Sequence, residues 1–192
     1  MDTTQFQLTF NGGWTHSANG ALPNGTTGYA NTGITPSTIL SLNDAHLSVY
    51  TRTNTNAGID IGSSVTGPTR HCYLAARSAG NFIGNINQAT NSVVATANSQ
   101  GWFTTSRTGS TTIDGYKNGT SILASVDVST ARPTQPIWLA ARNLDGNVDN
   151  GSVRQQAFAS IGSGLTAGEV STLYTLIQAF QTNLNTTPPR QV

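Results

Sequence analysis

Charged side chains are scarce in this sequence of 192 residues. They make up 9% of the chain and include one glutamate, Glu169, and one lysine, Lys117, whereas soluble domains usually carry about a quarter. The net charge is +1, and the eight arginines are scattered, with no basic run. Nucleic-acid grooves need clustered basic residues interleaved with aromatic ones. We therefore expect no nucleic-acid partner.

Cysteine and long apolar runs are also scarce. The single cysteine, Cys72, excludes an internal disulfide and reads as a small buried hydrophobe in a strand. No segment reaches the roughly 18 apolar residues of a membrane span. The first residues lack the basic and apolar regions of a secretory signal peptide. We expect either no export by that route or a virion component released by lysis.

The acidic residues are too few and too dispersed to indicate catalysis. Glycosidases usually need two facing carboxylates, but Asp60 and Asp114 are single acids on separate predicted strands. The three histidines, His16, His46 and His71, show no spacing typical of a zinc site. We therefore predict that the chain is not an enzyme, and a glycan-cleaving enzyme is kept as the least favoured alternative.

Short alternating segments, separated by Gly, Asn and Pro, dominate the sequence. Apolar and polar residues alternate with period two, which is typical of half-buried strands, and the even spacing favours a sandwich over a parallel sheet. The length suits one all-β domain. The predicted strands lie in residues 5–10, 46–53, 57–62, 70–77, 81–87, 101–107, 111–117, 121–128, 136–142 and 154–161.

Two local motifs in the second half of the chain predict a hairpin and a helix. Asn118-Gly119 lies between two strand patterns and predicts a hairpin with a type I′ turn, since both residues tolerate positive φ. Thr166 followed by Glu169 predicts a capping box, and the apolar spacing that follows predicts a helix over about 167–184. We expect a single domain over 1–184 and a tail over 185–192, because Pro188-Pro189 cannot continue a helix.

Several of these segments together resemble a known family. Their order is "IDGYKNGTSI", "PIWLAARN", "RQQAFASIG" and a helix opened by "GLTAGEVSTLY", preceded by "NGALPNGTTGYANTGITPS" and "HLSVYTRTN". This resembles concanavalin A-like (laminin G-like) jelly-roll domains, of the kind found in bacteriophage tail or virion proteins and bacterial surface proteins. The resemblance covers roughly residues 20–184. It implies an all-β, two-sheet antiparallel jelly-roll sandwich with one C-terminal helix, often used for glycan binding or adhesion.

Glycan recognition needs aromatic faces for stacking and polar groups for directional hydrogen bonds. Three aromatic residues adjoin Gly-rich turns, where rings can be exposed, and loop amides, an acid and strand-end arginines supply polar contacts. The predicted ligand-binding residues are Trp14, Tyr29, Trp102, Asn143, Asp145, Asn147, Arg52 and Arg142.

A calcium site is an alternative use of the loop at residues 144–152. Asp145, Asn147 and Asp149 stand at alternate positions, as in oxygen-rich calcium loops. Against this, the sixth position is Asn150 instead of Gly, and the twelfth is Gln156 instead of Glu. A plain turn between two strands is the favoured interpretation, and calcium as a cofactor is the alternative.

The sequence therefore predicts a non-catalytic binding or adhesion module of a virion or cell-surface protein. We expect this module to recognise a surface glycan. A structural virion domain that contacts only other protein chains is the alternative. The expected location is the virion, the cell surface or the extracellular space. Homo-oligomers are left open, because no heptad run points to one.

Overall fold

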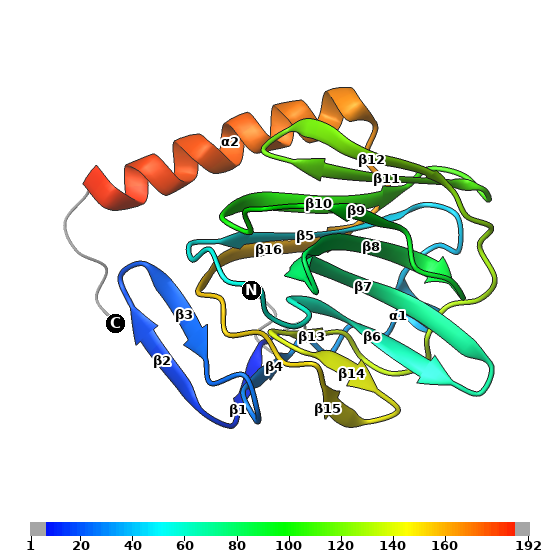
Figure 1. Ribbon diagram of the computed structural model, residues 1–192, viewed down its shortest axis with the longest axis horizontal. Coiled ribbons are helices and arrows are strands. Elements are labelled where there is room, and N and C mark those ends of the chain that lie inside the picture. The colour runs from blue at the N-terminus through cyan, green and yellow to red at the C-terminus, as the bar shows by residue number, and fades with distance from the viewer. Residues whose placement is uncertain (1–6, 187–192) are drawn as a thin grey trace.

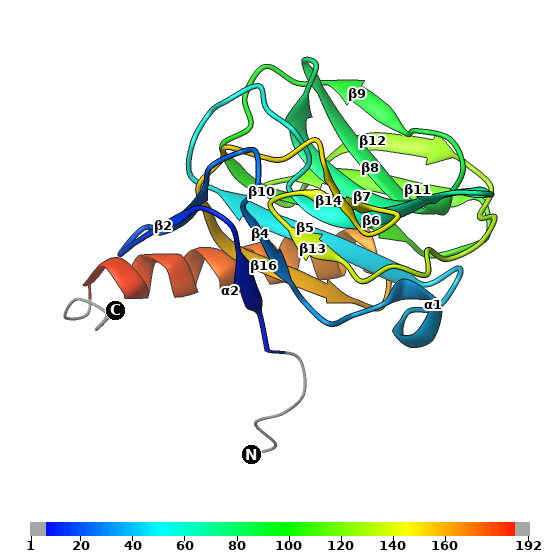
Figure 2. The same cartoon turned by 90° about the horizontal axis from the view of Figure 1, so that it is seen from below.

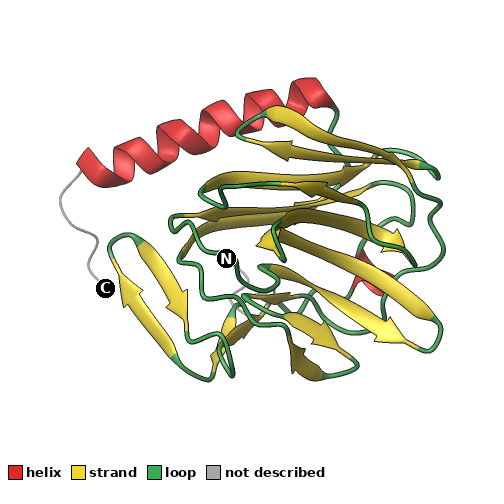
Figure 3. Ribbon diagram, in the orientation of Figure 1, coloured by secondary structure: helices red, strands yellow, loops and turns green. Residues whose placement is uncertain are grey.

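The computed structural model describes residues 7–186, and in them two β-sheets pack face to face (Figure 1). A long C-terminal helix runs along the outer face of one sheet, as the view from below also shows (Figure 2). The strands pair antiparallel except for one parallel contact, between β14 and β6. Strands and loops make up nearly all of the rest (Figure 3). The predicted antiparallel sandwich with one C-terminal helix is confirmed.

The first sheet has nine strands. Seven of them form a path, and a hairpin of two further strands joins it beside β6. In order across the sheet they are β1 (Thr9–Asn11), β4 (Tyr29–Asn31), β13 (Trp138–Leu139), β6 (Ile61–Thr66), β7 (Thr69–Ser78), β8 (Asn81–Gln88) and β9 (Val93–Ala95), with the hairpin β14 (Arg142–Leu144) and β15 (Asn147–Asp149).

The second sheet has seven strands, and two helices complete the described chain. Neither helix is both long enough and apolar enough to span a membrane. The order across the sheet is β12 (Thr120–Val126), β11 (Thr112–Lys117), β10 (Gly101–Arg107), β5 (Ala45–Thr51), β16 (Gln156–Gly162), β3 (Gly20–Pro23) and β2 (Trp14–Ser17), and the helices are α1 (Pro36–Ile39) and α2 (Ala167–Thr186).

Alternating residues of facing strands fill the core between the sheets. Leu47 and Val49 of β5 and Phe103 of β10 point inward, where they meet Leu74 and Phe82 from the other sheet. The rings of Phe82 and Phe103 stack with centroids 6.0 Å apart. Successive side chains of a strand point to opposite faces, so the alternation read from the sequence selects the core.

Helix α2 covers the outer face of the seven-stranded sheet. Its start is the predicted capping box: the Thr166 N–H donates to Glu169 Oε2 at 2.8 Å, and the Glu169 N–H donates back to Thr166 Oγ1 at 3.4 Å. Tyr174 of the helix stacks on Trp102 of β10, with ring centroids 6.2 Å apart. The lone glutamate therefore has a structural role at the helix start.

The turn predictions met different outcomes. The hairpin at Asn118-Gly119 is confirmed, since φ is +51° and +78° at these residues. The loop predicted over 144–152 is wrong in part, because β14 and β15 form a second hairpin there. Its turn, Asp145-Gly146, also has positive φ at both residues, +50° and +87°. It therefore uses the same kind of residue pair as the Asn118-Gly119 turn. Part of the strand predicted at 5–10 lies outside the described residues.

Candidate functional site

Two of the three predicted aromatic ligand contacts lie outside the groove and stack on other aromatic rings. The prediction of an exposed Trp102 ring is wrong: the residue is 0% exposed, because α2 covers the face of β10 on which it lies. Tyr29 is half-buried, and its ring stacks on Trp138 with centroids 3.8 Å apart. Trp14 is the one of the three that lies in a groove, described below.

The predicted polar contacts on the β14–β15 hairpin are used within the protein. Asn143 is buried, and its amide donates to the Pro136 carbonyl and accepts from the Gly146 N–H, both at 2.9 Å. Predicting it as a free loop group was wrong. Asn147 is exposed, and its amide donates to the Asp145 carbonyl at 3.4 Å.

The two predicted arginines are separate from each other and from the groove. Arg52 donates to Gln181 Oε1 of α2 at 2.6 Å, and its guanidinium carbon lies 5.6 Å from the centre of the Tyr50 ring. Arg142 forms an ion pair with Asp149 at 2.5 Å. Neither residue lines the groove.

The three candidate calcium ligands do not fit a calcium site. The Asp145 carboxylate accepts from the Thr66 hydroxyl at 2.6 Å and from the Thr66 N–H at 3.3 and 3.4 Å. The Asp149 carboxylate is paired with Arg142, whose positive charge opposes a cation. In the described part of the chain, no group of three or more His, Cys, Asp or Glu residues could hold a metal. We therefore do not carry Asp145, Asn147 and Asp149 forward as a calcium site.

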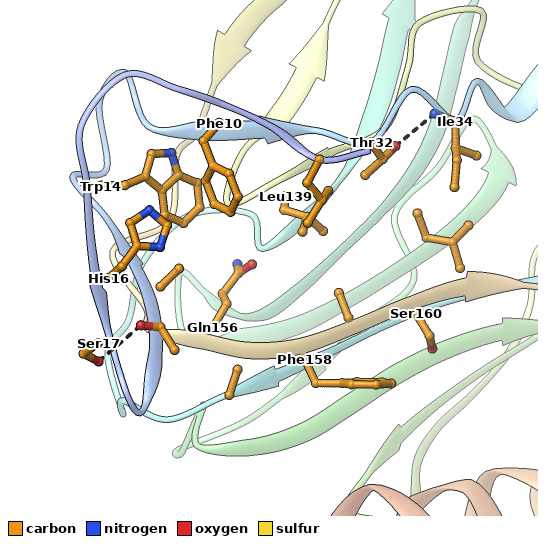
Figure 4. A pocket seen from close by; sticks show the side chains of 16 residues that line it. Phe10, Trp14, His16, Ser17, Thr32, Ile34, Leu139, Gln156, Phe158 and Ser160 are labelled. Carbon is orange, nitrogen blue, oxygen red and sulfur yellow. Dashed lines mark hydrogen bonds between the residues drawn. The ribbon is translucent and has the colours of Figure 1, made fainter. Parts of the chain in front are cut away.

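A groove of about 640 Å³ opens between the edges of the two sheets (Figure 4). Strand β1 and the β2–β3 hairpin form one side, and β16 forms the other. The residues that line it are Leu8, Phe10, Trp14, His16, Ser17, Gly20, Ala21, Thr32, Ile34, Leu139, Gln156, Ala157, Phe158, Ala159, Ser160 and Ile161.

Three aromatic side chains gather at one wall of the groove, and we call Phe10, Trp14 and His16 the aromatic cluster. Trp14 and His16 are two residues apart on β2, so they share a face of the strand. Phe10 of β1 stands edge-on to both, with centroid distances of 5.0 and 4.9 Å. The cluster therefore joins the edge strands of the two sheets, and Phe10 is 45% exposed.

Gln156 occupies the floor of the groove because β16 is irregular at its start. The register with β5 shifts between Gln156 and Phe158, which is a β-bulge. Bulges re-aim side chains, and Figure 4 shows the Gln156 amide between the aromatic cluster and Leu139. Gly20 of β3 passes close by with φ +124°, and a Cβ there would lie 2.3 Å from the Gln156 carbonyl oxygen.

Asp60 and His46 are tied into structural contacts, and Asp114 lies apart from Asp60. Asp60 is buried and paired with Arg154, and Asp114 lies on β11 of the opposite sheet. His46 Nδ1 lies 2.6 Å from the Ser163 carbonyl, which can only accept, so Nδ1 carries the proton. Its Nε2 then accepts from Ser160 Oγ at 2.9 Å. Burial lowers the pKa of His46, which keeps this arrangement neutral.

Sequence reasoning found one member of the groove, Trp14, and missed the others. Phe10 appeared only as an alternating residue of a predicted strand, and His16 as an isolated histidine. The relation of His16 to Trp14 could be seen in the sequence, because "WTHS" places the two residues on one face of a strand. The contact of Phe10 with them joins two sheets and could not be seen. Gln156 lies 140 residues further along the chain than His16, and no local signal links them.

The chain folds as a two-sheet antiparallel β-sandwich with a groove between sheet edges, and solved structures share that fold. Domain 4 of AbnA, a GH43 extracellular arabinanase from Geobacillus stearothermophilus solved in complex with arabinotriose, is 16% identical, with a TM-score of 0.57 over 88% of this chain and 87% of that one. The receptor binding domain of botulinum neurotoxin mosaic serotype C/D is 14% identical, with a TM-score of 0.60 over 88% and 45%.

A third similar structure is the binding domain of Paraclostridial Mosquitocidal Protein 1, which is 13% identical with a TM-score of 0.53 over 90% and 48%. This chain thus spans about half the length of the two toxin domains. No family model and no curated protein sequence matches the chain. At such identities the likeness establishes the fold alone, and it supports the resemblance to concanavalin A-like sandwiches at that level.

Proposed function

We propose that this chain is a non-catalytic carbohydrate-binding module whose ligand lies in the groove between β1, the β2–β3 hairpin and β16. The observation that carries the proposal is the aromatic cluster of Phe10, Trp14 and His16 on the wall of that groove. Rings held at a groove wall offer flat apolar faces to sugar C–H groups, and polar groups beside them fix orientation.

Two further observations support binding without turnover. Asp60 is shielded in an ion pair with Arg154, so it cannot exchange protons with a bound sugar. Glu169 is used at the start of α2. The structurally similar arabinanase domain was solved with arabinotriose, and the similar toxin domains are described as binding domains. These likenesses support a binding role and make arabinotriose the first ligand to test.

The proposed setting is a virion or cell-surface protein, in which the module attaches its carrier to a surface glycan. The low charge and the surface rich in Asn, Ser, Thr and Gly favour this setting, because neutral amides and hydroxyls contact sugars without needing charged partners. In this proposal Tyr29, Arg52, Arg142, Asp145 and Asn147 are not ligand contacts, since they lie outside the groove.

Isothermal titration calorimetry with arabinotriose and a panel of other oligosaccharides tests the proposal. Trp14→Ala and Phe10→Ala should each weaken binding by about tenfold or more, which corresponds to roughly 1.4 kcal/mol. Phe180→Ala is the matched control, because Phe180 on α2 is 45% exposed, as Phe10 is. The proposal fails if no oligosaccharide binds the wild-type protein, or if Phe180→Ala weakens binding as much as Phe10→Ala.

A structural role in protein–protein contacts is the second candidate, favoured by the outer face of α2. Leu176 and Phe180 are one helical turn apart and 61% and 45% exposed. Sedimentation velocity of the wild-type protein and a Leu176→Ser/Phe180→Ser variant tests this candidate. It predicts wild-type oligomers that dissociate in the double variant, and a monomeric wild-type protein that binds a glycan would contradict it.

A further inference from the structure

The Gln156 side chain has one end fixed and the other without a partner. Its Nε2 donates to the Asp60 backbone carbonyl at 2.9 Å. That bond sets which end of the amide is the oxygen, because a carbonyl can only accept. Gln156 is 8% exposed, and its Oε1 is buried with no hydrogen-bond partner among the described residues. Buried polar oxygens are usually paired. Among the described residues with an unpaired buried side-chain atom, Gln156 is the one that lines the groove, so this acceptor points to a ligand.

The polar side-chain atoms of Trp14 and Thr32 in the groove are already paired. Trp14 Nε1 donates to the Asn11 carbonyl at 3.0 Å, which also holds the indole ring in place. Thr32 Oγ1 donates to the Ile137 carbonyl at 2.8 Å and accepts from the Ile34 N–H at 3.1 Å, the second of which is drawn in Figure 4.

The remaining hydroxyls are occupied in the same way. Ser17 Oγ donates to the Gly20 carbonyl at 3.2 Å and accepts from the Gln155 side-chain amide at 2.9 Å. Ser160 Oγ bonds with His46 and Ser48. Gln156 Oε1 is therefore the buried side-chain acceptor that the described groove residues leave unmatched.

The groove also lacks formal charge. None of its described lining residues is Lys, Arg, Asp or Glu, and His16 is its one titratable side chain. A ligand with a carboxylate or sulfate would find no arginine fork or ammonium there, and would meet the negative end of the Gln156 carbonyl dipole. Sugar hydroxyls, in contrast, are neutral donors that match such an acceptor.

We propose, building on the carbohydrate-binding function above, that the ligand is a neutral oligosaccharide and that Gln156 determines its specificity. One sugar hydroxyl donates to Gln156 Oε1 on the groove floor while the same or the adjoining ring stacks on Trp14. Anionic sugars are excluded. Selection occurs at the floor because a hydroxyl missing there leaves the acceptor unpaired, whereas a change elsewhere on the sugar meets solvent or paired groups.

The position of the amide is prepared before the ligand arrives. The carbonyl that accepts from Gln156 Nε2 belongs to Asp60, and the Asp60 carboxylate is held by Arg154 Nε and NH2 at 2.8 and 2.6 Å. The bulge in β16 and the pairing of Gln156 with Ala21 fix the backbone. Little side-chain freedom is then lost on binding, which favours affinity.

The experiment compares two near-isosteric variants by calorimetry, with thermal melting as the check on folding. Gln156→Met removes the acceptor, and Gln181→Met is the matched control, because Gln181 is 4% exposed but lies on α2 outside the groove. With arabinotriose, or the neutral trisaccharide of the panel that binds most tightly, Gln156→Met should weaken binding by about tenfold. Gln181→Met should leave it unchanged.

Monodeoxy analogues of the same trisaccharide give a second reading that does not depend on the stability of a variant. The analogue that lacks the hydroxyl bound by Gln156 should bind wild-type protein about tenfold more weakly than the parent sugar does. The Gln156→Met variant should bind this analogue and the parent sugar equally well. Trigalacturonate and sialyllactose serve as anionic probes, and neither should compete with the neutral sugar.

The outcomes separate this inference from the function on which it rests. If wild-type protein binds the sugar and Trp14→Ala abolishes binding, while Gln156→Met and every deoxy analogue behave like their parents, Gln156 is not a specificity residue and the module assignment stands. Tighter binding of an anionic probe also overturns the inference. If wild-type protein binds no sugar at all, the proposed function itself fails.

Discussion

The carboxylate of Asp60 and the guanidinium of Arg154 form an ion pair in which both side chains are 0% exposed. Asp60 Oδ2 lies 2.6 Å from Arg154 NH2. The guanidinium also donates to the backbone carbonyls of Thr55, Gly58 and Arg77 at 2.9, 2.5 and 2.7 Å. The pair therefore joins the residues before β16 to the loop before β6 and the end of β7, directly behind the groove floor.

Removing one partner of this pair should destabilise the protein strongly. Asp60→Asn leaves the Arg154 charge buried without its counter-ion, so the free energy of unfolding should fall by about 3–5 kcal/mol. Arg142→Met is the control, because it breaks the Arg142–Asp149 pair, whose side chains are 18% and 33% exposed, and should cost only about 0–1 kcal/mol. Urea denaturation measures both; equal losses would contradict the prediction.

Gly20 should tolerate no side chain. In Gly20→Ala the new Cβ would lie 2.3 Å from the Gln156 carbonyl oxygen, and φ is +124°. We expect a loss of roughly 1–3 kcal/mol in stability together with weaker sugar binding. Gly33→Ala is the control: Gly33 also has positive φ, +71°, but a Cβ there meets nothing within 4 Å. It should lose about 1 kcal/mol and keep its affinity; an unaffected Gly20→Ala protein would refute the expected clash.

The Cys72 thiol should be unreactive in the folded protein. It is 0% exposed in the core, and burial raises its pKa to about 12. Because the thiolate is the reactive form, Ellman's reagent at about pH 8 should not label the native chain, and it should label the chain fully in urea. Rapid labelling without urea would show that the core around β7 opens readily.

Stability should decrease on mild acidification because of buried histidine. Burial lowers the pKa of His46 below its ordinary value of 6.5, and burial, followed by the nearby Arg142 charge, lowers that of His71. The unfolded chain then takes up protons first, so the free energy of unfolding falls as pH drops below about 6.5 and levels off below the folded-state pKa. Melting temperatures from about pH 7.5 to pH 5 measure this.

His46→Gln should flatten that pH dependence, whatever its effect on stability at neutral pH. The residual slope then belongs to His71. His16→Gln changes an exposed histidine and is the control for the general effect of losing an imidazole. An unchanged slope in His46→Gln would mean that His46 is not responsible for the acid sensitivity.

Elements governed by neighbouring residues could be predicted from the sequence. The Asn118-Gly119 turn and the Thr166–Glu169 cap follow from backbone chemistry within four residues. The Asp145-Gly146 turn obeys the same rule, but the sequence was interpreted there as a longer loop over 144–152, because the short strands on either side of the turn gave no clear alternation.

Features governed by distant residues could not be predicted. Trp102 follows a glycine at the start of its strand, which suggested an exposed ring. It is buried because α2 packs across that face of the strand. Arg154 and Asp60 are 94 residues apart, so the sequence around either residue does not indicate that they form a buried ion pair. The groove likewise depends on β1, β2 and β16 meeting, and the one local clue was an aromatic residue near glycines.

In the described chain, a single register pair, Gln156 with Ala21, joins β3 to β16, whereas seven pairs join β10 to β5. The β2–β3 hairpin is therefore the least firmly attached wall of the groove. Its amide hydrogens should exchange with deuterium well ahead of those in β5 and β10, because local opening needs few broken bonds. Occupied by a ligand, the same hairpin should exchange more slowly, so its exchange rate reports occupancy even where no heat of binding can be detected.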